Sequence, residues 1–153
     1  YVAFAVGFGG GLASEGGPVA HSWGVRNISR VLAYKLGGEH ELPPMPADDR
    51  LMPKPAPVTA DADTVLQGQV VYQRHCAYCH GDGLRTGGVT PDLRWSGENV
   101  HGIWQDIVLG GVLAPLGMVS FADYVSAEEA EAIRQYVLSE ANRRYAEINP
   151  EPE

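Results

Sequence analysis

The stretch Cys76-Ala77-Tyr78-Cys79-His80 decides the fold of this chain, because C-x-x-C-H is the sequence to which a c-type haem is covalently attached. Two thiols that lie three residues apart on a helical turn can each add to one vinyl group of a haem. The adjacent His80 is then held against the iron as an axial ligand. The motif therefore predicts one covalently bound haem c.

Other uses of a C-x-x-C pair fit this sequence less well. Cys76 and Cys79 are the only cysteines, so none is left for a further disulfide. A zinc site needs four nitrogen or sulfur ligands, and His101 stands alone where a second pair would be needed. A thioredoxin-like dithiol is expected beside a βαβ pattern, which this region lacks. Haem attachment is therefore favoured over zinc binding and over a redox dithiol.

Composition and charge restrict the class of protein and of partner. Apolar residues make up 44% of the 153 residues, which is enough for one core of ordinary size. The formal net charge of −8, made more negative by haem propionates, argues against nucleic acid or an anionic membrane as a partner. The longest apolar run, Tyr1–Phe8, is far shorter than the about 20 residues of a membrane-spanning helix. We therefore expect no membrane span, and no signal-peptide pattern is visible.

A proline-rich linker over residues 43–60 divides the chain and is typical of a semi-rigid, extended spacer. The preceding arm, residues 1–42, carries two short β-prone runs, Tyr1–Phe8 and Val31–Tyr34, separated by a glycine-rich segment. So small an arm buries too little surface to fold alone. We expect it to pack on the domain that follows or to exchange with a neighbouring copy.

The domain after the linker, residues 61–153, follows a helical pattern. Asp61 or Asp63 can cap a helix that runs into the haem motif, which places the attachment cysteines at the C-terminal end of that helix. A second helix is expected over Asn99–Leu109, and Gly110-Gly111 is a signal that ends it.

A last helix begins at a capping box. Ser126 and Glu129 have the S-x-x-E spacing of such a box, and apolar residues follow on one helical face. The expected fold class is therefore all-α, with helices around one covalently bound haem, preceded by a short β and glycine-rich arm and a proline-rich linker.

Met118 is the candidate for the second axial ligand. Met45 and Met52 lie in the linker before the haem motif, whereas Met118 follows the second expected helix in the loop Pro115-Leu116-Gly117-Met118. Such a loop can bring a thioether over the far face of the haem. The alternative is that Met118 fills the core, as most buried methionines do. A haem with one ligand already in place favours ligation.

These motifs together resemble those of a class I cytochrome c. The resemblance rests on Gly68-x-x-x-Tyr72, Cys76-x-x-Cys79-His80-Gly81, Gly117-Met118 and Tyr136. It implies a helical fold in which the first and last helices cross, with small and aromatic residues at the contact.

A more specific resemblance is to the C-terminal haem domain of quinohaemoprotein alcohol dehydrogenases. Pro91-Asp92-Leu93-Arg94, Gly110-Gly111 and Gly117-Met118-x-x-Phe121 carry it in the helical domain. In the arm and linker, the last strands of that family's eight-bladed propeller are resembled by Tyr1-Val2-Ala3 with the glycine-rich segment after it, by Leu32-Ala33-Tyr34-Lys35-Leu36-Gly37-Gly38 and by Leu42-Pro43.

The resemblance implies a role in electron transfer. Pyrroloquinoline quinone (PQQ) in the propeller oxidises an alcohol, and this haem collects the electrons one at a time for an external redox partner. The positions that bind PQQ and calcium, and those that act in catalysis, would lie upstream of Tyr1. The chain alone should therefore lack dehydrogenase activity. Because c-type haem is attached outside the cytoplasm in bacteria, the resemblance also implies a periplasmic protein.

Three further residues are candidates for contacts with the haem. Arg94 resembles the family arginine that meets a haem propionate, where a charge-assisted hydrogen bond would stabilise the anion. Trp95 and Trp104 could pack on the haem edge or fill the core, and we expect one of them to touch the ring. His75, directly before Cys76, is expected to point away from the ring as a surface side chain. The remaining histidines are expected to be structural or solvent-facing: His21, His40 and His101.

A second function class stays open at the level of sequence. In a free-standing haem enzyme or a gas or redox sensor, Met118 would be displaced and the iron would bind a small ligand or peroxide. A filled Met/His coordination favours the electron relay instead, because both axial positions are occupied.

Overall fold

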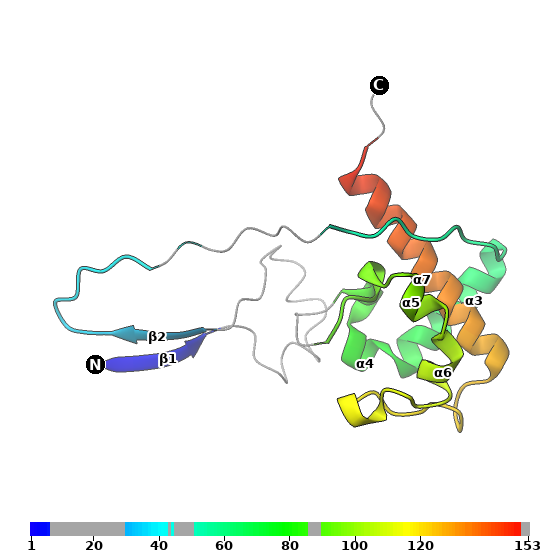
Figure 1. The fold of residues 1–153 in the computed structure, drawn as a ribbon, viewed down its shortest axis with the longest axis horizontal. Coiled ribbons are helices and arrows are strands. Elements are labelled where there is room, and N and C mark those ends of the chain that lie inside the picture. The colour runs from blue at the N-terminus through cyan, green and yellow to red at the C-terminus, as the bar shows by residue number, and fades with distance from the viewer. Residues whose placement is uncertain (7–29, 43, 45–50, 86–89, 151–153) are drawn as a thin grey trace.

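Two parts of the chain are visible in the computed structural model, which describes residues 1–6, 30–42, 44, 51–85 and 90–150 (Figure 1). One part is a two-stranded hairpin near the N-terminus. The other is a body of helices that begins after the proline-rich linker. The expectation of a helical fold preceded by a short β arm is confirmed.

The hairpin pairs strand β1 (Val2–Val6) with strand β2 (Arg30–Tyr34) in antiparallel fashion. Val2 lies opposite Tyr34, and Val6 lies opposite Arg30. Both β-prone runs of the sequence thus form strands where they are described. The glycine-rich segment that was expected between them lies outside the described residues.

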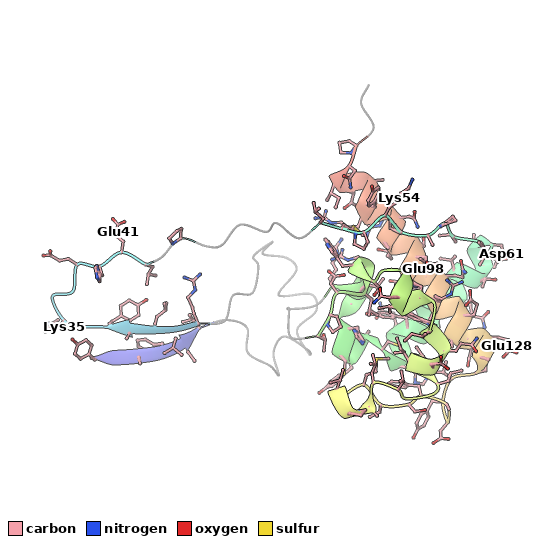
Figure 2. All side chains as sticks on the ribbon, in the orientation of Figure 1. Lys35, Glu41, Lys54, Asp61, Glu98 and Glu128 are labelled. Atoms are coloured by element: carbon pink, nitrogen blue, oxygen red, sulfur yellow. The ribbon has the colours of Figure 1, made fainter. Side chains whose placement is uncertain are left out.

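The hairpin stands apart from the helices (Figure 1). Its side chains are mostly exposed, including Phe4 at 52% and Val31 at 73%, and Phe4 contacts Tyr34 edge-on with ring centroids 6.0 Å apart. Packing of the arm on the helical domain is therefore not observed for these two strands (Figure 2), and exchange with a neighbouring copy stays a prediction. A lone hairpin of apolar strands is marginal in water and needs a third strand or a second layer.

Helix α3 (Ala62–His75) leads into the haem motif as the sequence predicted. Asp61 is its N-cap, because its extended backbone lets Oδ1 accept a hydrogen bond of 2.8 Å from the Thr64 N–H. The chain turns at Cys76 and continues as the short helix α4 (Ala77–His80). The capping prediction is confirmed at Asp61.

Helix α7 (Ala127–Ile148) closes the fold and begins at the predicted capping box. The Ser126 hydroxyl accepts a hydrogen bond from the Glu129 N–H at 3.1 Å, and the Glu129 carboxylate accepts one from the Ser126 N–H at 2.9 Å. Its outer face carries ion pairs such as Arg134 with Glu131. Among the described helices, none has an apolar stretch long enough to cross a membrane.

Helices α3 and α7 cross at Gly68, which is buried. A Cβ atom at this position would lie 1.9 Å from the backbone oxygen of Ala132, so only glycine permits the close approach. One turn further along α3, the rings of Tyr72 and Tyr136 meet with centroids 5.4 Å apart. A small residue and an aromatic pair thus form the crossing, as the resemblance to class I cytochromes c implied.

The predicted second helix is two short helices instead of one. Helix α5 (Glu98–His101) ends at Gly102, whose N–H bonds to the Glu98 oxygen, and α6 (Trp104–Val108) begins only after Ile103. Ile103 has φ −119° and ψ 28°, which breaks the helical path. The expected end at Gly110-Gly111 is confirmed, since Gly111 has φ +67°.

The second half of the proline-rich linker packs on α7. We call residues 51–60 the strip; in Figure 1 it crosses α7 before reaching α3. The Asn142 side-chain N–H₂ donates to the Ala56 oxygen at 2.8 Å, and the Thr59 N–H donates to Gln135 Oε1 at 2.9 Å. The domain boundary between residues 60 and 61 stays a prediction, but the strip is part of the folded body and does not act as a free spacer.

Candidate haem-binding site

The two cysteines sit on a single turn that follows α3. The N–H groups of Cys79 and His80 both donate to the Cys76 oxygen, at 3.2 and 2.9 Å. Cys79 is exposed, whereas Cys76 is half-buried against the core. Burial, with a smaller contribution from Cys79, raises the pKa of the Cys76 thiol to about 12, so the thiol is protonated at neutral pH. The spacing of two thiols on one turn fits double attachment to a haem.

His80 is buried and oriented by one backbone group. Its exposed fraction is 8%, and its Nδ1 lies 3.3 Å from the Pro91 oxygen. With Nδ1 protonated and donating to that carbonyl, Nε2 carries the lone pair that a metal needs. Burial lowers the pKa of the imidazole, which keeps the ring neutral. These properties are those required of an axial ligand to iron.

Hydrogen bonds hold the segment after the haem motif in place on both sides of Pro91. The hydroxyl of Thr90, the residue before Pro91, donates to the Cys79 oxygen. Asp92 caps the 3₁₀ turn η2 (Leu93–Trp95) and holds the Arg94 guanidinium with Nε at 2.9 Å and a terminal nitrogen at 2.6 Å. These bonds fix the path of the backbone at Pro91, and with it the orientation of the His80 ring.

Met118 reaches the same core from a loop. The 3₁₀ turn η3 (Ala114–Leu116) ends at Gly117, whose φ of +97° requires glycine in practice. The Met118 N–H then donates to the Leu113 oxygen at 3.3 Å. Its half-buried side chain packs on the core cluster that Cys76 also contacts. The loop therefore brings a thioether to the core that the attachment turn borders.

Comparison with known proteins relates the helical body to cytochrome domains. Residues 63–137 match the family described as cytochrome c oxidase, cbb3-type, subunit III. The chain is 42% identical over 146 residues to quinohemoprotein alcohol dehydrogenase ADH IIB of Pseudomonas putida, covering 95% of the chain and 21% of that protein. It is 39% identical over 148 residues to the dehydrogenase subunit of the alcohol dehydrogenase (quinone) of Gluconobacter oxydans, covering 95% of the chain and 19% of the relative.

A solved structure has the same fold. Quinohemoprotein alcohol dehydrogenase ADHIIG of Pseudomonas putida HK5 matches with a TM-score of 0.75 and 34% identity, over 94% of this chain and 21% of that one. The chain has the helical fold of a cytochrome c domain. It is similar to the cytochrome c portion of quinohaemoprotein alcohol dehydrogenases and spans about a fifth of the length of these relatives. A cytochrome c domain implies one haem c, and the buried neutral His80 beside a two-thiol turn fits that group.

Arg94 of this cytochrome is buried, at 9% exposure, and is not a solvated loop arginine. Asp92 neutralises it in part, and its guanidinium carbon lies 5.4 Å from the centre of the Trp95 ring. The pair leaves guanidinium N–H groups for a further acceptor, because Asp92 occupies only part of the five-donor fork. A contact of Arg94 with a haem propionate stays a prediction.

The two tryptophans have different environments in the cytochrome. Trp104 is 5% exposed, and its Nε1 donates to the Ala130 oxygen at 2.8 Å, so it joins α6 to α7. Trp95 is half-buried beside Arg94. The core-filling interpretation therefore fits Trp104. The expected contact of one tryptophan with the haem ring stays a prediction, for which Trp95 is the better candidate.

The other histidines follow the sequence-based expectation in part. His101 is buried and stacks on Trp104 with ring centroids 5.6 Å apart, which is a structural role. His75 was expected at the surface but is half-buried against Tyr124, with centroids 6.3 Å apart. His40 is exposed, and His21 lies outside the described residues.

Sequence reasoning missed two contacts that shape the site. The Tyr72 hydroxyl donates to the Gly81 oxygen at 2.6 Å and so joins α3 to the residue after His80. The signal was present, because a tyrosine on a buried helix face needs a partner for its polar tip. The Pro91 oxygen that orients His80 left no signal, since every residue has a backbone carbonyl.

Proposed function

We propose that this cytochrome c relays single electrons from a PQQ-containing dehydrogenase core to an external redox acceptor. Cys76 and Cys79 would hold one haem c covalently, and His80 and Met118 would bind its iron. The observation that carries the proposal is the bond between His80 Nδ1 and the Pro91 oxygen at 3.3 Å, which leaves Nε2 for iron. With His80 and Met118 both bound, the iron would have no open position for a substrate.

The chain's own residues give the site its chemistry. The Pro91 carbonyl holds the imidazole in one orientation, and the turn before Gly117 holds the Met118 side chain at the core. Buried His80 and half-buried Met118 would limit the access of water to the site, and the haem would supply reversible one-electron redox chemistry when it is bound. A soft sulfur ligand would favour the reduced state and so raise the potential.

The dehydrogenase core as electron donor is supported by the relatives and by the hairpin. The relatives are named as quinohemoprotein or quinone-dependent alcohol dehydrogenases, and the chain spans about a fifth of their length. Both strands of the hairpin expose apolar side chains, such as Phe4 and Val31, and have only each other as described strand partners. We infer that the hairpin pairs with strands of such a core, which holds PQQ and calcium, and that the protein is periplasmic.

The electron entry point lies beside Met118. Leu116 and Val119, its neighbours in the loop, are 82% and 58% exposed, and Tyr78 of the attachment turn is 67% exposed. We infer that these three side chains together form an apolar rim at the haem edge, and a contiguous exposed apolar patch of this kind is typical of a docking surface.

Stopped-flow reduction of the haem-loaded chain by a PQQ-dependent dehydrogenase core tests this function. Val119→Lys should slow reduction at several ionic strengths while the potential is unchanged, because a charge would be buried at the contact. Val70→Lys is the matched control, since Val70 is 51% exposed on α3, outside the loop. Equal rates for Val119→Lys and wild type would exclude this rim as the entry point. No reduction of the wild-type chain, or carbon monoxide binding to its reduced haem, would contradict the relay itself.

A further inference from the structure

Gln135 is a buried polar residue whose hydrogen-bonding capacity is fully used. It lies on α7 with 2% of its surface exposed. Its Oε1 accepts from the N–H groups of Thr59 and Ala60, at 2.9 and 3.3 Å. Its Nε2 donates to the Thr59 hydroxyl at 3.1 Å and to a Glu131 carboxylate oxygen at 2.7 Å. A side-chain amide has two donors and two acceptor sites, so none is spare.

A second side-chain amide, that of Asn142, binds the strip further along α7. Nδ2 of Asn142 donates at 2.8 Å to the Ala56 oxygen and at 2.8 Å to the oxygen of Leu138 on its own helix. Contact between the strip and the helical body begins sharply at Met52, because Leu51 is 92% exposed whereas Met52 is only 9% exposed. The strip is therefore attached from Met52 onward.

The composition of the strip explains why α7 must supply these partners. Pro53, Pro55 and Pro57 have no N–H group, so they cannot pair as a strand would. The Thr59 and Ala60 N–H groups have no helical partner, because they come just before α3. One glutamine on a neighbouring helix satisfies both of them.

This attachment shortens the chain that can separate the hairpin from the helical body. Nine residues, 43–51, lie between Leu42 and Met52. However they are arranged, they span at most about 32 Å at roughly 3.5 Å per residue. If the strip were released, the eighteen residues 43–60 could span about 63 Å.

We propose that Gln135 and Asn142 act together as positioning residues for electron transfer, because the two amides bind the strip to α7 and so keep the tether between the hairpin and the haem domain at about half of its released length. The proposal rests on the proposed function, in which the hairpin is seated on a dehydrogenase core. The effective concentration of a tethered domain falls as about the −3/2 power of tether length, so doubling the tether lowers it about threefold.

The attachment is measured first, by hydrogen exchange in the haem-loaded full chain. In wild type, the Thr59 and Ala60 amides should be protected because both donate to Gln135. In Gln135→Leu their exchange should rise more than tenfold. The matched control is Gln105→Leu, the same change at an exposed glutamine of α6, which should leave both amides unchanged. Unprotected amides in wild type would overturn the proposal.

Positioning is then measured by haem reduction with a saturating PQQ-dependent core. For the double variant Gln135→Leu/Asn142→Leu, in which both amides that hold the strip are lost, the limiting rate should fall by up to about threefold, while the half-saturating core concentration, the haem potential and the rate of reduction by ascorbate stay at their wild-type values. A merely structural role would change the potential or the ascorbate rate. An unchanged limiting rate in a variant whose amides exchange freely would overturn the proposal.

A fallback variant and the wild-type control distinguish the remaining outcomes. If the double variant does not fold, Asn142→Leu alone releases Ala56 and should lower the limiting rate by a smaller factor; no decrease there would overturn the proposal. If the wild-type chain is not reduced by the core at all, the proposed function fails. If wild type is reduced and the variants match it, only the role of the two amides fails.

Discussion

The two segments that supply the candidate axial ligands are built in different ways. His80 follows directly from the packed helix α3, is 8% exposed and has its ring oriented by the Pro91 carbonyl. Met118 lies in a loop that a left-handed glycine at position 117 redirects, and its neighbours Leu116 and Val119 are among the most exposed apolar residues.

The two sides of the site therefore depend on different parts of the structure. The His80 side depends on the crossing of α3 and α7, so damage there removes the fold that forms the site. The Met118 side lies in a loop with exposed apolar neighbours, so changes there should alter the potential and the partner while the fold survives. Each of the following experiments tests one side of this comparison.

The largest effect is expected at the crossing that supports the His80 side. In Gly68→Ala, the added Cβ would lie 1.9 Å from the Ala132 backbone oxygen, so the two helices must move apart. We expect a loss of about 3 kcal/mol or more in the free energy of unfolding, measured with urea on the haem-loaded chain. Gln67→Ala, on the exposed face of α3, is the control and should change it by less than about 0.5 kcal/mol. Equal unfolding free energies for Gly68→Ala and wild type would show that the crossing tolerates a side chain.

A smaller effect on stability, with a large one on the spectrum, is expected for Met118→Ala. The side chain is only half-buried, so the unfolding free energy should fall by about 1–2 kcal/mol. The sixth position would open, so the haem should bind carbon monoxide and its potential should fall. An unchanged low-spin spectrum with an unchanged potential would place the second ligand elsewhere.

The helices that lead to the Met118 loop should respond to pH through His101. Burial lowers the pKa of this imidazole, with Arg134 lowering it further and Glu98 opposing. Below the usual histidine pKa of about 6.5, the unfolded chain binds a proton that the folded chain does not, so stability falls as pH decreases.

The expected slope from His101 is at most about 1.4 kcal/mol per pH unit between the two pKa values. Urea unfolding at pH 7.0 and 5.5 should therefore show a larger loss for wild type than for His101→Phe, which keeps an aromatic ring against Trp104. Parallel losses in the two proteins would mean that His101 does not titrate in this range.

The smallest effect is expected from Tyr72→Phe, which tests one hydrogen bond on the His80 side. It removes only the hydroxyl that donates to the Gly81 oxygen at 2.6 Å, and the ring contact with Tyr136 is kept. A cost of about 1 kcal/mol in unfolding free energy is expected, with little change in potential. Tyr124→Phe, at a 70% exposed tyrosine, is the control. A large shift in potential for Tyr72→Phe would mean that Gly81 helps to place His80.

Local signals in the sequence predicted much of the fold. The Asp61 cap, the Ser126 capping box and the stop at Gly110-Gly111 each depend on residues within one helical turn. The two strands were also recognisable from short β-prone runs. Such features could be inferred because the residues that cause them are close in sequence.

Features that join distant parts of the chain could not be predicted in this way. The bond between Thr59 and Gln135 spans 76 positions, and nothing in a proline-rich sequence indicates which helix it will meet. The break at Ile103 was missed because Gly102 alone does not end a helix, and isoleucine is a common helical residue. The roles of Arg94 and of the two tryptophans depend on where they sit around the haem, which spacing does not give.

The backbone oxygen of Pro91 gives the His80 orientation an unusual resistance to point mutation. Any of the twenty residues at that position would offer the same acceptor, so no single substitution can delete it. Only a change in the path of the chain between Thr90 and Asp92 could remove it. The direction of the imidazole is thus encoded in the course of the main chain, and sequences that share little at this position can still present the same ring to the iron.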